Sequence, residues 1–166
     1  MTPAGASAAR ASLSLRFEPQ AEQIAHVRNL ISELCSPHIA NEDELSRLLL
    51  ATHELLENIV KYTASGIAEF QFALVPTEAG LKAVVRTSNC ATEARLEDAR
   101  TRLDALARAA DPAAFYDEMI RASARRDGSG LGLARITAES EMVLGYAVER
   151  DVLTISAELI VSDRTS

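Results

Sequence analysis

Cysteine and long apolar runs are both scarce in this sequence. Its 166 residues include two cysteines, Cys35 and Cys90, which lie far apart and outside any recognised metal-binding spacing. We therefore exclude a disulfide framework and expect both thiols to be reduced. No apolar run approaches the roughly 18 residues of a membrane span, and the first residues lack the apolar stretch of a secretory signal. These absences predict a cytoplasmic protein without a membrane segment.

Positive charge is also in the minority. Lys and Arg total 17 against 24 Asp and Glu, which gives a formal net charge of -7 and a pI near 5.0. Because this balance disfavours attraction to phosphate backbones, we expect no nucleic acid partner. Several arginines nevertheless crowd the third quarter of the chain, and we interpret them as a solvated helical face: Arg95, Arg100, Arg102, Arg108, Arg121, Arg125 and Arg126.

The remaining composition is that of an ordinary globular domain, with 48% hydrophobic and 25% charged residues. Residues 1–11 are rich in Ala and Ser and show no hydrophobic periodicity, so we expect a flexible arm there. One domain is predicted to fill residues 12–162.

Hydrophobic periodicity predicts an α+β protein. The expected elements are a strand over 13–17, helices over 20–34 and 41–62 (with Asn41 as N-cap), hairpin strands over 67–75 and 81–87, a helix marked by Leu96, Leu103 and Leu106, a helix starting at Pro112, a helix over 131–139, and strands over 142–149 and 152–161. This order favours a two-layer α/β sandwich, in which helices cover one face of a mixed, mostly antiparallel sheet. The other face stays open or binds a partner, so a homodimer is a plausible assembly.

A polar motif lies within the helix predicted over 41–62. Glu54, Asn58 and Lys61 occur at positions i, i+4 and i+7, which places a carboxylate, an amide and an ammonium group on one helix face. The Asn oxygen is a suitable Mg²⁺ ligand, the carboxylate is a candidate general base, and the lysine can neutralise phosphate. The alternative is an exposed amphipathic face stabilised by a pair between Glu57 and Lys61.

A glycine-rich loop precedes the helix predicted over 131–139. Gly128, Gly130 and Gly132 would allow the backbone to approach phosphates closely, although a flexible turn is the simpler interpretation. No Gly-Lys-Ser/Thr follows, and the loop does not open directly after a strand. P-loop and Rossmann sites are therefore disfavoured.

The two motifs together resemble those of the GHKL ATPases, which include histidine-kinase catalytic domains, gyrase-type ATPases and anti-sigma-factor serine kinases. The segment Glu-Leu-Leu-Glu-Asn-Ile-Val-Lys-Tyr-Thr (54–63) is similar to the family's N box, and Gly-Ser-Gly-Leu-Gly-Leu-Ala (128–134) is similar to its second glycine box. The resemblance covers roughly residues 13–161. It implies the Bergerat fold of histidine-kinase-like ATPases, with ATP and Mg²⁺ as cofactors.

The resemblance also assigns expected roles to single residues. Asn58 would hold Mg²⁺, Glu54 would be the general base, Lys61 would contact phosphate, and Tyr62 would line the nucleoside pocket. The expected nucleotide-binding segment of the lid consists of Gly128, Ser129, Gly130, Leu131 and Gly132.

Within the family, the sequence is most similar to stand-alone anti-sigma-factor-type and SiaB-like Ser/Thr protein kinases. Histidine kinases usually have Asn at the position of Glu54, whereas the serine kinases and ATP hydrolases have Glu. The resemblance therefore implies phosphorylation of Ser or Thr on a small STAS-like protein, within a bacterial partner-switching module.

The family's adenine-binding Asp-x-Gly-x-Gly box is degenerate here. The corresponding stretch, Val84–Cys90, contains neither Asp nor Gly. Ser88 or Asn89 could still accept a hydrogen bond from the adenine amino group. Three hypotheses remain: the protein kinase, a catalytically silent pseudokinase that binds or sequesters a regulator, and an ATPase without a protein acceptor.

Overall fold

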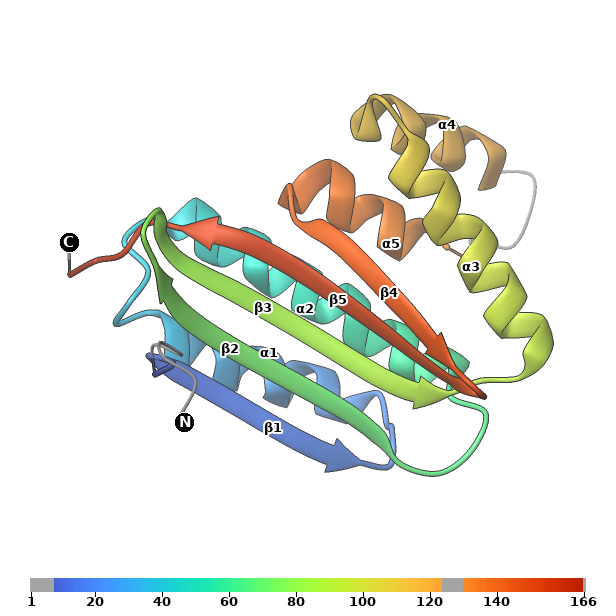
Figure 1. Ribbon diagram of the computed structural model, residues 1–166, viewed down its shortest axis with the longest axis horizontal. Coiled ribbons are helices and arrows are strands. Elements are labelled where there is room, and N and C mark those ends of the chain that lie inside the picture. Colours follow the sequence, from blue (N-terminus) through green and yellow to red (C-terminus); the bar gives the residue numbers. More distant parts are fainter. Residues whose placement is uncertain (1–7, 124–129, 166) are drawn as a thin grey trace, which may run out of the picture.

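The computed structural model describes residues 8–123 and 130–165, and they form a five-stranded sheet with helices packed against it (Figure 1). In chain order the elements are β1 (Ala11–Phe17), α1 (Glu22–Cys35), α2 (Glu42–Tyr62), β2 (Ala68–Thr77), β3 (Gly80–Cys90), α3 (Glu93–Arg108), α4 (Pro112–Ser123), α5 (Leu131–Arg135), the π-helical turn η1 (Ile136–Ser140), β4 (Val143–Glu149) and β5 (Val152–Val161). The α+β class expected from the sequence is confirmed.

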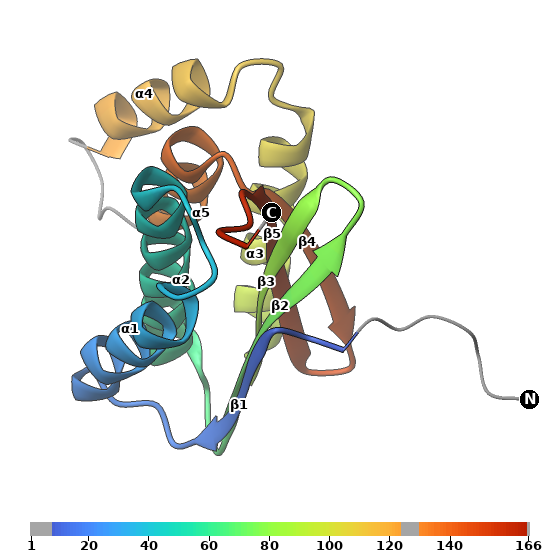
Figure 2. The same ribbon diagram turned by 90° about the vertical axis from the view of Figure 1, so that its left-hand side faces the viewer.

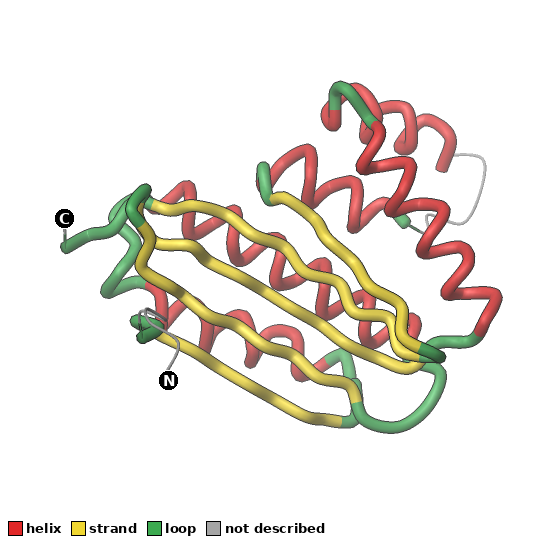
Figure 3. Tube along the Cα trace, in the orientation of Figure 1, coloured by secondary structure: helices red, strands yellow, loops and turns green. Residues whose placement is uncertain are grey.

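The strand order in the sheet is β1-β2-β3-β5-β4. Every strand pairing in the described part of the chain is antiparallel. The prediction was a mixed, mostly antiparallel sheet. Two tight hairpins close where Thr77 pairs with Gly80 and where Glu149 pairs with Val152. Figure 3 shows the strands as one continuous twisted layer with α2 running along it.

The two faces of the sheet differ because side chains alternate along each strand. On one face Phe70, Phe72 and Leu74 of β2 are buried at 0–2% exposure, and α1 and α2 cover this side (Figure 2). On the other face Gln71 and Arg86 are exposed. The predicted two-layer sandwich with one open face is therefore what the chain forms.

Helix α2 is anchored in the centre of the core. Its N-cap is Asn41, as predicted, with the side-chain Oδ1 accepting a hydrogen bond of 2.9 Å from the backbone N–H of Asp43. Acidic residues occupy its first turn and Lys61 its last, which complements the helix dipole. Apolar positions with helical spacing, among them Leu48, Leu55 and Ile59, are buried at 0–1% exposure. The polar residues of α2 are thus held by a fixed element.

Several boundaries differ from the prediction by one to three residues, and the helix after the glycine segment also differs in type. The helix expected over 131–139 is α-helical only to Arg135 and continues as the π-helical turn η1, where the Ser140 hydroxyl donates to the carbonyl of Ile136. Residues 1–7 of the predicted arm lie outside the described residues. Farther along that arm, the backbone N–H of Arg10 donates to the carbonyl of Leu74 at 2.8 Å.

Among the helices of the described ranges, none is long and apolar enough to cross a membrane.

Candidate functional site

The polar face of α2 and the glycine segment at the start of α5 line one cavity of about 230 Å³. The residues expected from the sequence that meet there are Glu54, Asn58, Lys61, Tyr62, Gly130, Leu131 and Gly132. Glu57, Tyr116 and Arg135 complete the lining. Two motifs separated by about seventy positions in the chain are therefore adjacent in space.

Glu54 is the buried acid of this cavity, with 7% of its surface exposed. Its Oε1 accepts a hydrogen bond from Nη1 of Arg135 at 3.1 Å. On the other side, Gly132 approaches so closely that a Cβ at that position would lie 2.5 Å from Oε2 of Glu54. Because a buried carboxylate needs a partner, the ion pair stabilises Glu54, while the glycine leaves room for it.

Arg135 connects Glu54 to a second acid. Its Nε donates to Oε2 of Glu139 at 2.8 Å, one helical turn along the chain. The hydrogen bond to Glu139, together with the weaker contribution of Glu54, raises the pKa of Arg135 above its ordinary value. Partial burial and the charge of Glu139 also raise the pKa of Tyr116 on α4. The guanidinium is thus permanently charged, and the tyrosine beside it stays a neutral hydroxyl at physiological pH.

Asn58 lies one turn beyond Glu54 on α2. Its Nδ2 is buried and has no hydrogen-bond partner among the described residues. Such an atom is unusual, because buried polar groups are nearly always satisfied. The orphaned nitrogen is a donor and would suit an oxygen of a ligand, whereas the Mg²⁺ contact expected of Asn58 would use its Oδ1. This amide fits the Mg²⁺ or nucleotide contact expected of it.

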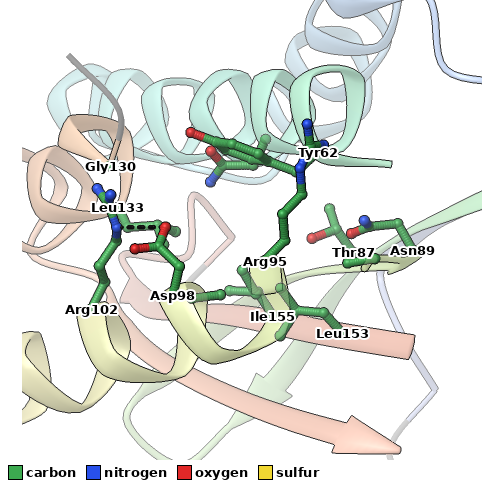
Figure 4. A pocket seen from close by; sticks show the side chains of 13 residues that line it. Tyr62, Thr87, Asn89, Arg95, Asp98, Arg102, Gly130, Leu133, Leu153 and Ile155 are labelled. Carbon is green, nitrogen blue, oxygen red and sulfur yellow. Dashed lines mark ion pairs between the residues drawn. The ribbon is translucent and has the colours of Figure 1, made fainter. Parts of the chain in front are cut away.

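A second, narrower cavity of about 50 Å³ adjoins the first. Asn58, Tyr62 and Gly130 line both cavities. The floor is formed by sheet residues, with Leu153 and Ile155 of β5 beside Thr87 and Asn89 of β3 (Figure 4). The far wall is helix α3, which contributes Arg95, Asp98, Ala99 and Arg102. An apolar floor with a few polar groups is typical of a ligand site. The volume of about 50 Å³ is smaller than the roughly 300 Å³ that a drug-sized ligand needs, so such a ligand would have to move the side chains that line the cavity.

Arg95 closes one end of this second cavity. Figure 4 shows its side chain reaching from α3 towards Tyr62 on α2. The guanidinium carbon lies 5.5 Å from the centre of the Tyr62 ring, and Nη1 donates to the backbone carbonyl of Lys61 at 3.1 Å. Nζ of Lys61 lies 5.3 Å from the same ring. Tyr62 therefore contacts two cations, an arrangement that is favourable for an aromatic face.

Arg102 lies at the other end, where the two cavities meet. Its Nε pairs with Oδ2 of Asp98 at 2.9 Å (Figure 4). The guanidinium contacts Gly130, where a Cβ would collide with Nη1. Gly130 has a φ of +94°, a backbone conformation that residues with a side chain rarely adopt. The backbone conformation therefore requires glycine at this position, and any other side chain would also displace the Arg102 guanidinium.

Some of the predicted site residues do not join this group. Ser88 cannot contact the cavity that Asn89 lines, because consecutive strand residues face opposite sides of a sheet. It lies on the open face, where its hydroxyl is 2.9 Å from the hydroxyl of Thr154. Of the two alternatives for an adenine contact, only Asn89 is in place, and its Nδ2 already donates to the carbonyl of Cys90 at 3.3 Å. Gly128 and Ser129 lie outside the described residues.

Several lining residues were not foreseen from the sequence. Arg95 is exposed, as the interpretation of a solvated face expects, and Arg102 is partly buried, but both also line the cavity, which was not predicted from the sequence. A signal was present, because Arg95, Asp98 and Arg102 are spaced by three and four positions and so share one helix face. Thr87 carried a signal too, since it lies two residues before Asn89 on the same strand face. Nothing in the sequence pointed to Tyr116 or Arg135.

A metal at this site would depend on few protein ligands. No group of three or more His, Cys, Asp and Glu that could hold a metal occurs among residues 8–123 and 130–165. Mg²⁺ commonly uses one or two protein oxygens together with water and phosphate oxygens. An Asn58 ligand next to a phosphate-sized cavity is compatible with that preference.

Comparison with known proteins gives a structural match only. No family model matches the chain, and no curated protein matches it. The fold is similar to that of a chain in the crystal structure of the SiaB–SiaC complex from Pseudomonas aeruginosa, with a TM-score of 0.67 and 19% sequence identity. The match covers 90% of this chain and 89% of the other. At this level of identity, the similarity concerns the fold.

Proposed function

We propose that the protein is a Mg²⁺- and ATP-dependent Ser/Thr protein kinase that phosphorylates a small STAS-like regulator in a partner-switching module. The observation that carries this proposal is the meeting of two cavities at Asn58, Tyr62 and Gly130. One cavity is mainly apolar, and the other contains a buried acid, a lysine and backbone glycine. A nucleotide has the same two-part chemistry, with a planar base at one end and charged phosphates at the other.

The residues divide between these two parts. Tyr62, Thr87 and Asn89 would bind the nucleoside. Asn58 would hold Mg²⁺, which supplies neutralisation of phosphate charge when bound, and Lys61 would add a second positive charge. Gly130 and Gly132 line the polar cavity without a side chain, which would leave room there for phosphate oxygens.

Glu54 would act on the protein substrate. A Ser or Thr hydroxyl of the partner loses its proton to the Glu54 carboxylate as its oxygen bonds to the transferred phosphorus, and the bond to the leaving diphosphate breaks. Arg135 keeps the carboxylate in one position, at 3.1 Å from Nη1. Catalysis would then come from positioning and charge neutralisation.

A protein partner is supported by the structural comparison. The similar fold comes from a complex of two proteins, SiaB and SiaC, so this fold is known in an assembly with a second chain. Phosphorylation adds about two negative charges at pH 7 and weakens an interface with a protein that is itself acidic. The net charge of -7 on this chain is consistent with such a switch.

A phosphoryl-transfer assay with the STAS-like protein encoded nearest to this gene tests the proposal. We expect labelled phosphate from ATP on Ser or Thr of the partner with wild type, and a loss of at least a hundredfold with Glu54→Gln, as is usual for a general base. Glu42→Gln, on the exposed first turn of the same helix, is the matched control and keeps full activity. Release of free phosphate without a labelled partner would instead indicate an ATPase.

A silent binding module is the second candidate, and two observations favour it. The cavity for the base has only about 50 Å³ of free space, and the segment Val84–Cys90 contains neither the Asp nor the glycines of the adenine-binding box. This candidate predicts tight partner binding that is unaffected by ATP or by Glu54→Gln. Equal partner affinities with and without nucleotide, together with no labelled partner, would exclude the kinase.

A further inference from the structure

The two walls of the site carry different charges. Helix α2 contributes Glu54 and Asn58 together with Lys61, whereas α3 contributes Arg95, Asp98 and Arg102. The α3 residues are spaced so that they share one face, and Figure 4 shows all three directed into the cleft. Arg100 of the same helix does not line either cavity and pairs with Glu97 at 3.7 Å on an exposed face. Of these α3 arginines, Arg95 and Arg102 therefore line the cleft and Arg100 does not.

From this arrangement we infer that Arg102 is a phosphate ligand of the proposed nucleotide site and that Asp98 competes with the phosphate for it. The inference rests on the proposed function. Arg102 contacts Gly130, the glycine at which the apolar and polar cavities meet. A phosphate joined to a nucleoside in the narrow cavity would therefore lie near Arg102, where Gly130 separates the two cavities.

The pair between Arg102 and Asp98 is suited to exchange. Nε of Arg102 lies 2.9 Å from Oδ2 of Asp98, but the Asp98 side chain is 55% exposed and that of Arg102 is 30% exposed. Exposed ion pairs are weak, because water competes for both groups. A polyphosphate offers more charge and a geometry that matches the guanidinium fork, so it can replace the Asp98 carboxylate.

A structural role of the pair makes a different prediction. If Arg102 and Asp98 only hold α3 in place, loss of either partner breaks the same contact and changes nucleotide affinity in the same direction. If Asp98 competes with phosphate, loss of Asp98 strengthens nucleotide binding, whereas loss of Arg102 weakens it. The signs of the two effects therefore separate the alternatives.

The test is calorimetric titration of the whole protein with a non-hydrolysable ATP analogue and Mg²⁺, and in parallel with adenosine. We expect Arg102→Ala to lose roughly tenfold or more in affinity for the ATP analogue, as for removal of a charge-assisted hydrogen bond, with an unchanged affinity for adenosine. Asp98→Asn should increase the affinity for the ATP analogue severalfold. Arg100→Ala, the matched control on the same helix, should leave both affinities unchanged, and Arg102→Lys should recover part of the loss.

The outcomes distinguish this inference from the proposed function. Failure of the wild type to bind the ATP analogue contradicts both. Binding by the wild type with affinity changes of the same sign in Arg102→Ala and Asp98→Asn, or with no change in Arg102→Ala, overturns the role of Arg102 alone. A higher affinity in Arg102→Ala also overturns it, because the side chain would then block the site.

Discussion

Helices α2 and α3 form opposite walls of the same site but are held in different ways. Helix α2 buries Leu48, Leu55 and Ile59 among others and has a side-chain N-cap. Helix α3 buries only Leu96, Leu103 and Leu106 over its sixteen residues and has no side-chain cap. The groups on α2 are therefore fixed by the core, whereas α3 is held by fewer buried side chains and by the hydrogen bond between Tyr146 and Asp104. A site built in this way has one rigid wall and one wall that can adjust to a ligand.

The largest expected difference between the walls is in stability. Leu55→Ala removes a fully buried side chain of α2 and should lower the free energy of unfolding by about 3–5 kcal/mol. Leu106→Ala, near the end of α3 and 8% exposed, should cost roughly half as much, because the neighbouring surface can collapse into the gap. Urea denaturation of both variants measures this. Equal costs would mean that α3 is as firmly packed as α2.

Gly132→Ala tests the contact between the α2 wall and the glycine segment. The new Cβ would lie 2.5 Å from Glu54 Oε2, so the carboxylate has to move away from Arg135. We expect a loss of about 1–3 kcal/mol in stability, as in other overpacked sites, and a loss of the Glu54-dependent reaction.

Gly145→Ala on the open sheet face is the matched control for that substitution. Its Cβ would lie 3.0 Å from the Ser156 hydroxyl, which can turn aside. The change in stability should stay within about 1 kcal/mol, since alanine also stiffens a strand. Denaturation curves that coincide for the two alanine variants would show that Gly132 is not constrained by Glu54.

Tyr146→Phe tests how α3 is attached to the sheet. The Tyr146 hydroxyl on β4 donates to Oδ1 of Asp104 on α3 at 2.7 Å, and this hydrogen bond raises the pKa of Tyr146. We expect faster amide hydrogen exchange in α3 and unchanged exchange in α2. Equal protection of α3 in wild type and variant would show that this hydrogen bond does not hold the helix.

The smallest effect concerns the two cysteines. Burial in the core raises the pKa of Cys35 from 9.0 to about 12. The unfolded chain therefore loses this proton first, so the stability that the buried thiol contributes is complete below pH 9 and falls as the pH rises towards 12. Cys35→Ala should flatten that alkaline decline in urea denaturation.

Thiol labelling gives a matched comparison within the same chain. Cys90, half-buried at the end of β3, should be alkylated in the folded protein at pH 8, whereas Cys35 should react only on unfolding. Equal labelling rates for the two thiols would contradict this prediction.

The fold could be predicted from the sequence because each element repeats one strong pattern. The alternation of Leu13, Leu15 and Phe17 predicts a strand, and Asn41 marks the start of α2 in both sequence and structure. The sandwich and its open face follow from the order of such elements. The switch from α5 to the π-helical turn η1 could not be foreseen, because it depends on local bonds such as that of the Ser140 hydroxyl to Ile136.

The site could be predicted only where it is encoded within one segment. Glu54, Asn58 and Lys61 share a face by helical spacing alone. The glycines at 130 and 132 predicted a close approach of the backbone, because they have no side chain. Arg135 and Tyr116 reach the site from other elements, so their contacts with Glu54 depend on how the helices pack. Ser88 and Asn89 could not be separated until the face of β3 that meets the helices was known.

The most direct test is calorimetric titration with an ATP analogue, with and without Mg²⁺, for wild type, Asn58→Ala and the exposed control Asn29→Ala on α1. We expect Mg²⁺-dependent binding in the wild type and the control, and its loss in Asn58→Ala without a loss of fold by circular dichroism. Absence of binding in the wild type, measured alone and with its protein partner, would contradict a nucleotide site between α2 and α3.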